Sequence, residues 1–261
     1  MNKTFQWLIL LAVVVGGAVG LYLWRASETP APQLAQPPTV SAPVEPAIRY
    51  PIEATGQAQG SDEPLPALAD SDKAMQDALA KLFGRNLQKF FNLQGIIHRV
   101  VATVDNLPLG HLPAQILPVK SLPGWLITTG KGEELRLSPK NAARYQPYVG
   151  VAKSVPVAPL VSIYARFYPL FQEQYEKLGY PGKYFNDRVV QVIDHLLAAP
   201  EVKDPVLLTQ TSVLYQFADA NLEKLSAGQK ILVRMGGENA ASVKAKLKEI
   251  RSALMATPPK G

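Results

Sequence analysis

Arginines and tyrosines set among apolar residues are the side chains of this sequence whose types and spacing could do chemistry. A guanidinium group binds carboxylate or phosphate through paired hydrogen bonds and stacks on aromatic rings. We expect a groove lined by such residues to hold an anionic glycan or a peptide. The candidates in the middle of the chain are Arg144, Tyr145, Tyr164, Arg166, Tyr168, Arg188 and Arg234.

The same arginines also have a structural interpretation. Buried ion pairs between arginine and aspartate can hold helices in register without any activity. The pairs would be formed by Asp105, Asp194 and Asp219 with Arg144, Arg188 and Arg234. Sequence alone leaves this alternative open beside the binding groove.

A second candidate binding surface is a basic strip near the C-terminus. Lys244, Lys248 and Arg251 recur at intervals of three or four residues, which places them on one side of a helix. Only Glu249 interrupts the positive charge in this stretch. The strip predicts contact with an anionic partner or a membrane surface, and a solvated, solubilising face is the alternative.

Signatures of catalysis are weak. Glu173 and Glu176 lie three residues apart and would suit a pair of acid–base carboxylates on one helical face, but exposed glutamates are common on helices. The histidines His98, His111 and His195 lack partners at metal-ligand spacing. The sequence has no cysteine and no nucleophile elbow. We therefore assign no catalytic residue, no metal and no cofactor.

Helices must position most of these candidates. Apolar residues at intervals of three and four indicate amphipathic helices, with Ser71 and Asn186 as candidate N-caps and Gly179 as a helix end. The predicted helices cover residues 71–83, 96–104, 158–178, 186–197 and 238–254. In the last of these, Val243 and Leu247 begin the apolar stripe.

One segment has the pattern of strands. Residues 125–129 and 135–137 flank Gly130-Lys131-Gly132, which predicts a short β-hairpin. The fold class is therefore mainly α with one small β-hairpin: a single globular helical domain behind an N-terminal transmembrane helix and a disordered linker. We place the anchor at 1–25, the linker at 26–66, the globular head at 67–257 and a disordered tail at 258–261.

The anchor is predicted from residues 5–24, which carry no charge. A helix of this length reaches about 30 Å, the thickness of the hydrocarbon core of a bilayer, and aromatic residues stand at both ends. A cleavable signal peptide is the rival, because Ala18-Val19-Gly20 resembles a cleavage site. We expect an uncleaved, single-pass anchor in the inner membrane with the head on the periplasmic side.

The linker and the head differ in charge. The linker is rich in proline, and such a segment cannot bury enough apolar surface to fold. It holds one basic and five acidic residues, whereas residues 67–261 hold 24 basic and 16 acidic residues. The basic character of the chain therefore belongs to the head, and it indicates an anionic partner such as an acidic envelope protein or a cell-wall polymer. An exported head does not favour nucleic acid.

Short strings spread over the head carry a resemblance to a known family. They include Val101-Ala102-Thr103-Val104-Asp105-Asn106-Leu107-Pro108, Tyr168-Pro169-Leu170-Phe171-Gln172, Phe185-Asn186-Asp187-Arg188, Asp194-His195-Leu196-Leu197 and Leu225-Ser226-Ala227-Gly228-Gln229-Lys230. On these strings the chain resembles the bacterial domain-of-unknown-function family 3014, whose members pair an N-terminal membrane helix with a helical head. The resemblance implies this architecture and brings no catalytic residue.

The sequence thus predicts a membrane-tethered envelope protein whose head is a non-catalytic binding or scaffolding module for an anionic partner. The alternative is a hydrolase that acts on a cell-wall or membrane-proximal substrate through carboxylates. A cytoplasmic adaptor with inverted topology is a third hypothesis. Composition does not fix the oligomeric state.

Overall fold

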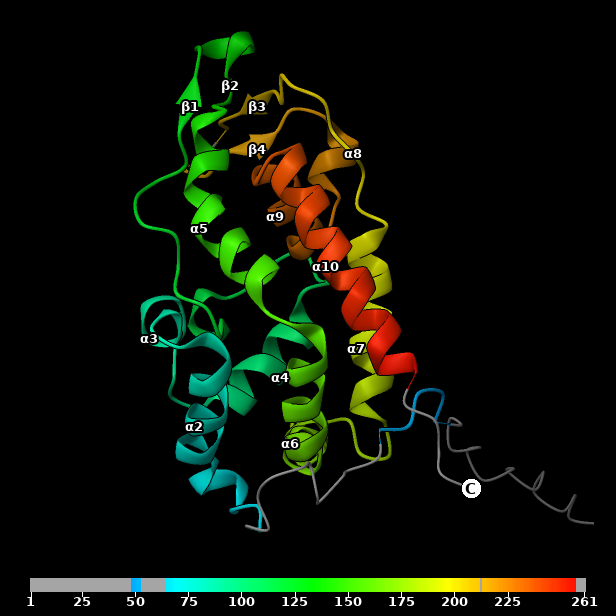
Figure 1. The fold of residues 1–261 in the computed structure, drawn as a ribbon. Helices are drawn as coiled ribbons and strands as arrows, with labels where there is room; N and C mark the ends of the chain where they lie inside the picture. Colours follow the sequence, from blue (N-terminus) through cyan, green and yellow to red (C-terminus); the bar gives the residue numbers. More distant parts are fainter. Residues whose placement is uncertain (1–47, 53–63, 212, 257–261) are drawn as a thin grey trace, which may run out of the picture. The chain divides into compact units, whose positions relative to one another are not determined.

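Helices make up most of the chain that the computed structural model describes, which is residues 48–52, 64–211 and 213–256 (Figure 1). The longer helices are α2 (Ser71–Phe83), α4 (Ile96–Asn106), α5 (Lys140–Ser154), α6 (Val157–Lys177), α7 (Phe185–Leu197) and α10 (Gly237–Met255). Shorter ones are α3 (Asn86–Phe90), α8 (Ala220–Glu223) and α9 (Ala227–Arg234), with 3₁₀ turns at Leu68–Asp70, Ala114–Ile116 and Gly132–Glu134. The predicted mainly helical class is confirmed.

Two small antiparallel sheets lie at one end of the helices (Figure 1). Strand β1 (Thr128–Thr129) pairs with β2 (Arg136–Leu137), which confirms the predicted hairpin. Gly130 in its turn has φ +81°, and a Cβ there would lie 2.2 Å from the Glu134 carbonyl oxygen, so the turn requires glycine. The second sheet, β3 (Leu208–Thr209) with β4 (Gln216–Phe217), was not predicted, because the residues between its strands contain no glycine or proline to mark a turn.

The five predicted helices are confirmed as α2, α4, α6, α7 and α10, but two of the predicted caps are wrong. Ser71 lies inside α2 and donates its hydroxyl to the Leu68 carbonyl at 2.7 Å. Asn186 lies in the first turn of α7, fully buried, and donates its amide to the Tyr50 carbonyl at 2.9 Å. The Ser71 side chain thus closes the 3₁₀ turn before α2, whereas Asn186 serves a tertiary contact that its local sequence does not reveal.

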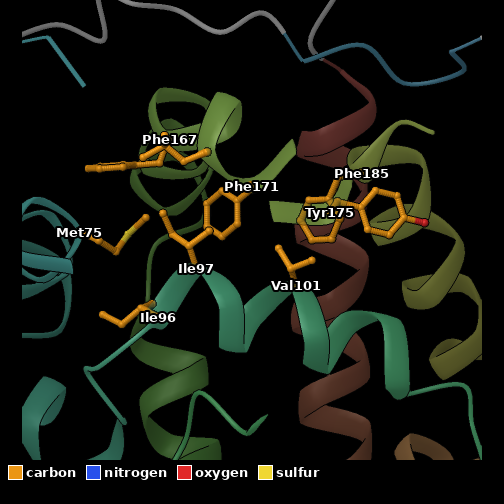
Figure 2. Packing of buried hydrophobic residues seen from close by; sticks show 9 residues of the cluster. Met75, Ile96, Ile97, Val101, Phe167, Phe171, Tyr175 and Phe185 are labelled. Atoms are coloured by element: carbon orange, nitrogen blue, oxygen red, sulfur yellow. The ribbon is translucent and has the colours of Figure 1, made fainter. Parts of the chain in front are cut away.

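The main hydrophobic cluster lies where α4 crosses α2, α6 and α7. Figure 2 shows side chains of α4 facing those of α6 and α7 across the cluster. Val101 and Phe185 are fully buried, and the Phe171 and Phe185 rings stack with their centroids 6.0 Å apart. Each such side chain contributes about 1.5–3 kcal/mol by leaving water, so this cluster fixes the relative positions of the four helices.

Helix α10 packs along α5, α7 and α6 (Figure 1). The predicted stripe of Val243, Leu247, Ile250 and Leu254 faces these helices and joins two of the hydrophobic clusters, which confirms it. The packing brings the last helix of the chain against α5, on which two of the candidate binding residues lie.

Residues 48–52 form a strap on the head. The Asp187 carboxylate accepts the backbone N–H groups of Arg49 at 3.0 Å and Tyr50 at 2.8 Å. The Tyr184 hydroxyl accepts the N–H of Ile52 at 2.6 Å, and the Ile52 side chain is buried. Although these residues fall within the predicted linker, they are bound to α7. The predicted transmembrane helix, the rest of the linker up to residue 63 and the tail lie outside the described residues.

Length and hydropathy decide whether a helix in the described part of the chain could cross a membrane. No single helix there is both long enough and apolar enough to cross a bilayer. Helices α5 and α6 meet this test only as a pair, with a bend of 80° between them.

Candidate functional site

Two adjoining cavities lie beside α5 and α9, each of about 620 Å³. We call them the polar pocket and the apolar chamber. The polar pocket is lined by charged side chains of α5, α8 and α9 and by the loops around residues 110–126 and 213–216. The apolar chamber is lined by α3, α5, α10 and the loop at 117–122. Four residues border both cavities: Leu117, Leu122, Tyr145 and Ile231.

Helix α9 supplies the basic side chains of the polar pocket. A capping box holds its start, since Ser226 accepts the N–H of Gln229 at 3.2 Å and the Gln229 side chain accepts the N–H of Ser226. A Cβ on Gly228 would lie 2.5 Å from a methyl carbon of Leu196, so glycine lets α9 approach α7 closely. Lys230 and Arg234 are four residues apart and therefore share one face of α9.

The polar pocket is electropositive. Its lining holds three basic side chains, Arg144, Lys230 and Arg234, and one acidic side chain, Glu223. Lys230 and Glu223 form an ion pair at 2.6 Å, and Glu223 also accepts the N–H of Phe217 at 2.9 Å. Burial alone would raise the pKa of Glu223, but the hydrogen bond from Lys230 and the neighbouring positive charges hold it below its ordinary value.

Arg234 and Tyr145 have hydrogen-bond donors in the polar pocket that are not used by the described residues. The Arg234 guanidinium lies 5.5 Å from the centre of the Phe217 ring, and it makes no hydrogen bond or ion pair with any residue that the structure describes. The Tyr145 hydroxyl likewise has no hydrogen-bond partner among those residues. Burial raises the pKa of Tyr145, although the positive charges of Arg234 and Arg144 oppose the rise. Both groups are therefore available as donors to an anion.

Arg144 has a different role. Its guanidinium donates to the carbonyl oxygens of Pro123 at 2.6 Å, Gly124 at 2.9 Å and Trp125 at 2.8 Å. It also donates to the Asn141 side chain at 3.1 Å. Because its donors are already used, Arg144 positions the loop that forms one wall of the pocket and adds positive charge to it.

The apolar chamber has few polar side chains, and apart from Ser121 and the shared Tyr145 they have partners among the described residues. The Tyr148 hydroxyl donates to the Lys120 carbonyl at 3.0 Å. The Lys246 ammonium group donates to the Val155 carbonyl at 3.2 Å and pairs with Glu249 at 2.7 Å. The rest of the lining is mainly aliphatic and aromatic. The chamber is therefore better suited to bind a nonpolar ligand than a polar one.

The other predicted groove residues do not join this pocket. Tyr164 and Tyr168 belong to an aromatic cluster on α6 with Phe171, Phe185 and Tyr184. Burial raises the pKa of both tyrosines well above the ordinary value. Arg166 lies 5.5 Å from the centre of the Phe167 ring and borders neither cavity. Of the seven predicted residues, the structure brings together Arg144, Tyr145 and Arg234.

Arg188 follows the structural interpretation. It pairs with Asp105 at 3.0 Å across α4 and α7, and Tyr180 donates its hydroxyl to the same carboxylate at 3.0 Å. The other predicted aspartate pairs differ from expectation. Asp194 pairs with Arg251, and Asp219 caps α8 by accepting the N–H of Asn221 at 2.7 Å.

The basic strip of α10 is partly used within the molecule. Lys244 donates to the Ala199 carbonyl, and Arg251 binds the Asp194 carboxylate through two nitrogen atoms. The hydrogen bonds that Arg251 donates to the Asp194 carboxylate raise the pKa of Arg251. Lys248 alone of the three is exposed without an interaction among the described residues. Lys244 and Arg251 therefore fasten α10 to the end of α7.

One contact has the residue types of a hydrolase. The ring nitrogen Nε2 of His195 lies 2.8 Å from the Ser226 hydroxyl. Ser226 is buried, however, and its oxygen caps α9, while neither residue borders any of the cavities described above. The contact is therefore part of the packing of α9 on α7.

Carboxylates and metal ligands give no catalytic arrangement in the described part of the chain. Glu173 pairs with Lys177 at 2.7 Å, and Glu176 accepts the Gln172 amide at 2.8 Å, so the two predicted carboxylates are engaged separately. No group of three or more His, Asp or Glu side chains among the described residues could hold a metal ion.

Sequence reasoning missed Lys230 and the whole apolar chamber. A signal for Lys230 was present, because Ser226 and Gln229 have the spacing of a capping box and place Lys230 one turn before Arg234. No such signal exists for the chamber, whose lining comes from segments more than 150 residues apart in the sequence.

Comparison with known proteins gives one match. Residues 96–251, more than half of the chain, match the profile of a family described as "Protein of unknown function (DUF3014)". No curated protein and no solved structure matches the chain significantly. The match confirms the resemblance predicted from the short strings, and it covers both α5 and α9.

Proposed function

Since the chain belongs to the DUF3014 family, whose description assigns no function, we propose from the site itself that the head is a non-catalytic binding module for an anionic ligand. The ligand binds in the polar pocket. The observation that carries this proposal is the Arg234 guanidinium, which borders the pocket without a hydrogen bond or ion pair among the described residues.

The physical argument concerns desolvation. A partly buried guanidinium without hydrogen bonds loses the stabilisation that bulk water would give it, and an anion restores that stabilisation. Tyr145 offers a second donor from the opposite helix, and Lys230 adds positive charge. A carboxylate or phosphate that reaches Arg234 thus gains charge-assisted hydrogen bonds, and the single carboxylate of Glu223 is already held by Lys230.

The location of the module is part of the same proposal. An apolar segment at residues 5–24 would anchor the chain in the inner membrane, and the proline-rich stretch after it would carry the head into the periplasm. The ligand would then be an anionic component of the envelope or of the membrane surface. The hydrolase alternative has no support from the contacts of Glu173, Glu176, His195 or Ser226.

Trp125 provides a direct test, because its indole borders the polar pocket and is 91% exposed. The chain has three tryptophans. Replacing Trp7 and Trp24 with Phe leaves Trp125 as the only tryptophan in the full-length chain, which is reconstituted in nanodiscs of zwitterionic lipid. Titration with hexanoate, inorganic phosphate and a uronic-acid disaccharide should give a saturable change in Trp125 fluorescence with at least one of these probes.

Two arginine variants make the test specific. Arg234→Gln should weaken binding of the responding probe about ten-fold or more, the loss expected for a charge-assisted hydrogen bond. Arg166→Gln is the matched control, since Arg166 also lies 5.5 Å from a phenylalanine ring but outside the pocket. Absence of a saturable response to all three probes, or equal binding by parent and Arg234→Gln, would overturn the proposal.

A further inference from the structure

The inner wall of the polar pocket is also the outer wall of the apolar chamber. Tyr145 and Ile231 face both cavities from α5 and α9, and Leu117 and Leu122 do so from the intervening loop. The charged and the nonpolar cavity are therefore neighbours across a single layer of side chains. A ligand can occupy both cavities by passing between these shared side chains.

The apolar space extends further inward. A third cavity of about 220 Å³, lined only by nonpolar residues and Tyr164, lies beyond the chamber and shares Leu160 and Ile250 with it. Protein interiors are normally packed with few voids larger than a water molecule, and unfilled apolar volume lowers stability. The apolar chamber, at about 620 Å³ and with a mainly nonpolar lining, falls within the size range of small-molecule sites.

We infer that the ligand is a single-chain anionic amphiphile whose acidic group binds Arg234 and Tyr145 and whose alkyl chain lies in the apolar chamber. The inference rests on the proposed function and names the class of the ligand. Charge complementarity fixes the orientation, because the unpaired guanidinium is at the polar end. The two ammonium groups in the lining of the chamber are already engaged, that of Lys246 with Glu249 and that of Lys120 with the Gln88 carbonyl.

The rim of the polar pocket fits the delivery of such a molecule. Trp125, Val213 and Leu214 border the pocket and are 91%, 90% and 72% exposed. Tryptophan and aliphatic side chains at a mouth favour the interface of a bilayer, where amphiphiles reside. A protein helix or a glycan is a poorer occupant, since the chamber has the volume of a small ligand and a lining that is mainly aliphatic and aromatic.

Position-resolved photolabelling of the full-length chain in nanodiscs tests the inference. Two hexadecanoic acid probes are used, one with a diazirine next to the carboxyl group and one with a diazirine near the methyl end. Peptide mass spectrometry should place the first adduct on residues of the polar pocket. The second adduct should fall on the chamber, on residues such as Val149, Ala152 and Val243.

Three substitutions separate the two ends of the ligand. Ala152→Phe on α5 and Val243→Phe on α10 fill the chamber from different helices, and each should remove the adduct of the methyl-end probe from the chamber. Ala143→Phe is the matched control on the exposed side of α5 and should leave it unchanged. Arg234→Gln should weaken labelling by both probes.

Competition by unlabelled acids adds a quantitative test. In the parent, competition should strengthen roughly two- to four-fold for each methylene added to the chain. The same competition is measured with Ala152→Phe. The ratio of the apparent affinity of the parent to that of Ala152→Phe cancels the partitioning of the acid into the nanodisc. This ratio should grow with the length of the alkyl chain.

The outcomes distinguish the inference from the proposed function. If both diazirines label only the polar pocket, or if both filling variants label like the parent, the chamber does not hold the chain and the inference fails while an anion site at Arg234 stands. If labelling does not depend on Arg234, the proposed function fails as well. Adducts of the two probes in separate cavities, with the methyl-end adduct lost from the chamber in both filling variants and both adducts weakened in Arg234→Gln, would establish the inference.

Discussion

Two regions of the head differ in whether their charged groups have hydrogen-bond and ion-pair partners. Between α4 and α7, Asp105 is bound by Arg188 and by the Tyr180 hydroxyl, and both ends of the ion pair are largely buried. Between α5 and α9, Arg234 and the Tyr145 hydroxyl have no hydrogen-bond or ion-pair partner among the described residues. We call the first the closed region and the second the open region.

The difference separates a network that stabilises the fold from one available for binding. A buried charge without a partner is costly, so a fold retains it only if packing elsewhere is sufficient. The closed region includes the main hydrophobic cluster and borders only the smaller cavity of about 220 Å³ among those described above, whereas the open region borders two cavities of about 620 Å³ each. Matched substitutions in the two regions should therefore have unequal effects on stability.

Truncation of a phenylalanine should give the largest difference. Phe167 is 1% exposed in the closed region and borders none of the cavities described above, so Phe167→Ala should lower the free energy of unfolding by about 3–5 kcal/mol. Phe91 borders the apolar chamber and is half-buried, so Phe91→Ala should cost about 1–2 kcal/mol. Urea denaturation followed by circular dichroism measures both. Equal losses would remove the distinction between the regions.

The arginines give the next largest difference. Arg188→Gln leaves the buried Asp105 carboxylate without its ion pair and should cost about 3 kcal/mol. Arg234→Gln removes one ring contact and should cost less than about 1 kcal/mol. Urea unfolding of both variants, with Arg166→Gln as a control, measures these losses of unfolding free energy. A large loss at Arg234 would mean that its guanidinium is structural, contrary to the proposed function.

The strap belongs to the closed region and can be tested locally. Asp187→Asn removes the ionised acceptor of the Arg49 and Tyr50 N–H groups and should cost about 1 kcal/mol, a roughly five-fold increase in detached strap. Brief trypsin digestion should then cleave more rapidly after Arg49, as measured by mass spectrometry. Asp77→Asn, which alters only an exposed ion pair on α2, should leave the rate unchanged. An unchanged rate in Asp187→Asn would show that other contacts hold the strap.

Sequence predicted the parts of the fold that depend on local periodicity. The helices with a clear apolar stripe were predicted to within a few residues, and so was the hairpin around its required Gly130. Helix α9 was missed because it spans eight residues, too few for a convincing stripe. The strap was missed because proline-rich composition predicts the absence of a core, while its bonds to Asp187 connect residues 137 and 138 positions apart.

The candidate site was predicted only in part, and for a related reason. Arg144, Tyr145 and Arg234 were singled out by their apolar neighbours, and the structure brings them to one pocket. The same reasoning selected Arg188, which is committed to Asp105, and the α10 strip, two of whose members fasten α10 to α7. Sequence shows that a charge lies in an apolar stretch, but only tertiary structure shows whether it has a partner.

The smallest effect concerns Glu223, the single acidic side chain of the open region's pocket. Its pKa in the folded chain is depressed, chiefly because Lys230 donates to it against the cost of burial. A group with a depressed folded pKa stabilises the fold above its unfolded pKa, about 4.3, and that contribution is lost as pH falls through the lower folded value. About a third of the side chain is exposed, so the contribution should be below about 1 kcal/mol.

Glu223→Gln should therefore flatten the dependence of unfolding free energy on pH between about pH 5 and pH 3, while Glu133→Gln on the exposed turn should not. The same variant frees Lys230 and removes the pocket's negative charge, so it should bind the anionic probe of the Trp125 titration a few-fold more tightly at neutral pH. The two effects have opposite signs, because the carboxylate stabilises the empty pocket and competes with an anion for Lys230. Weaker binding by Glu223→Gln would mean that this carboxylate positions Lys230 for the ligand, and the open region would then resemble the closed one.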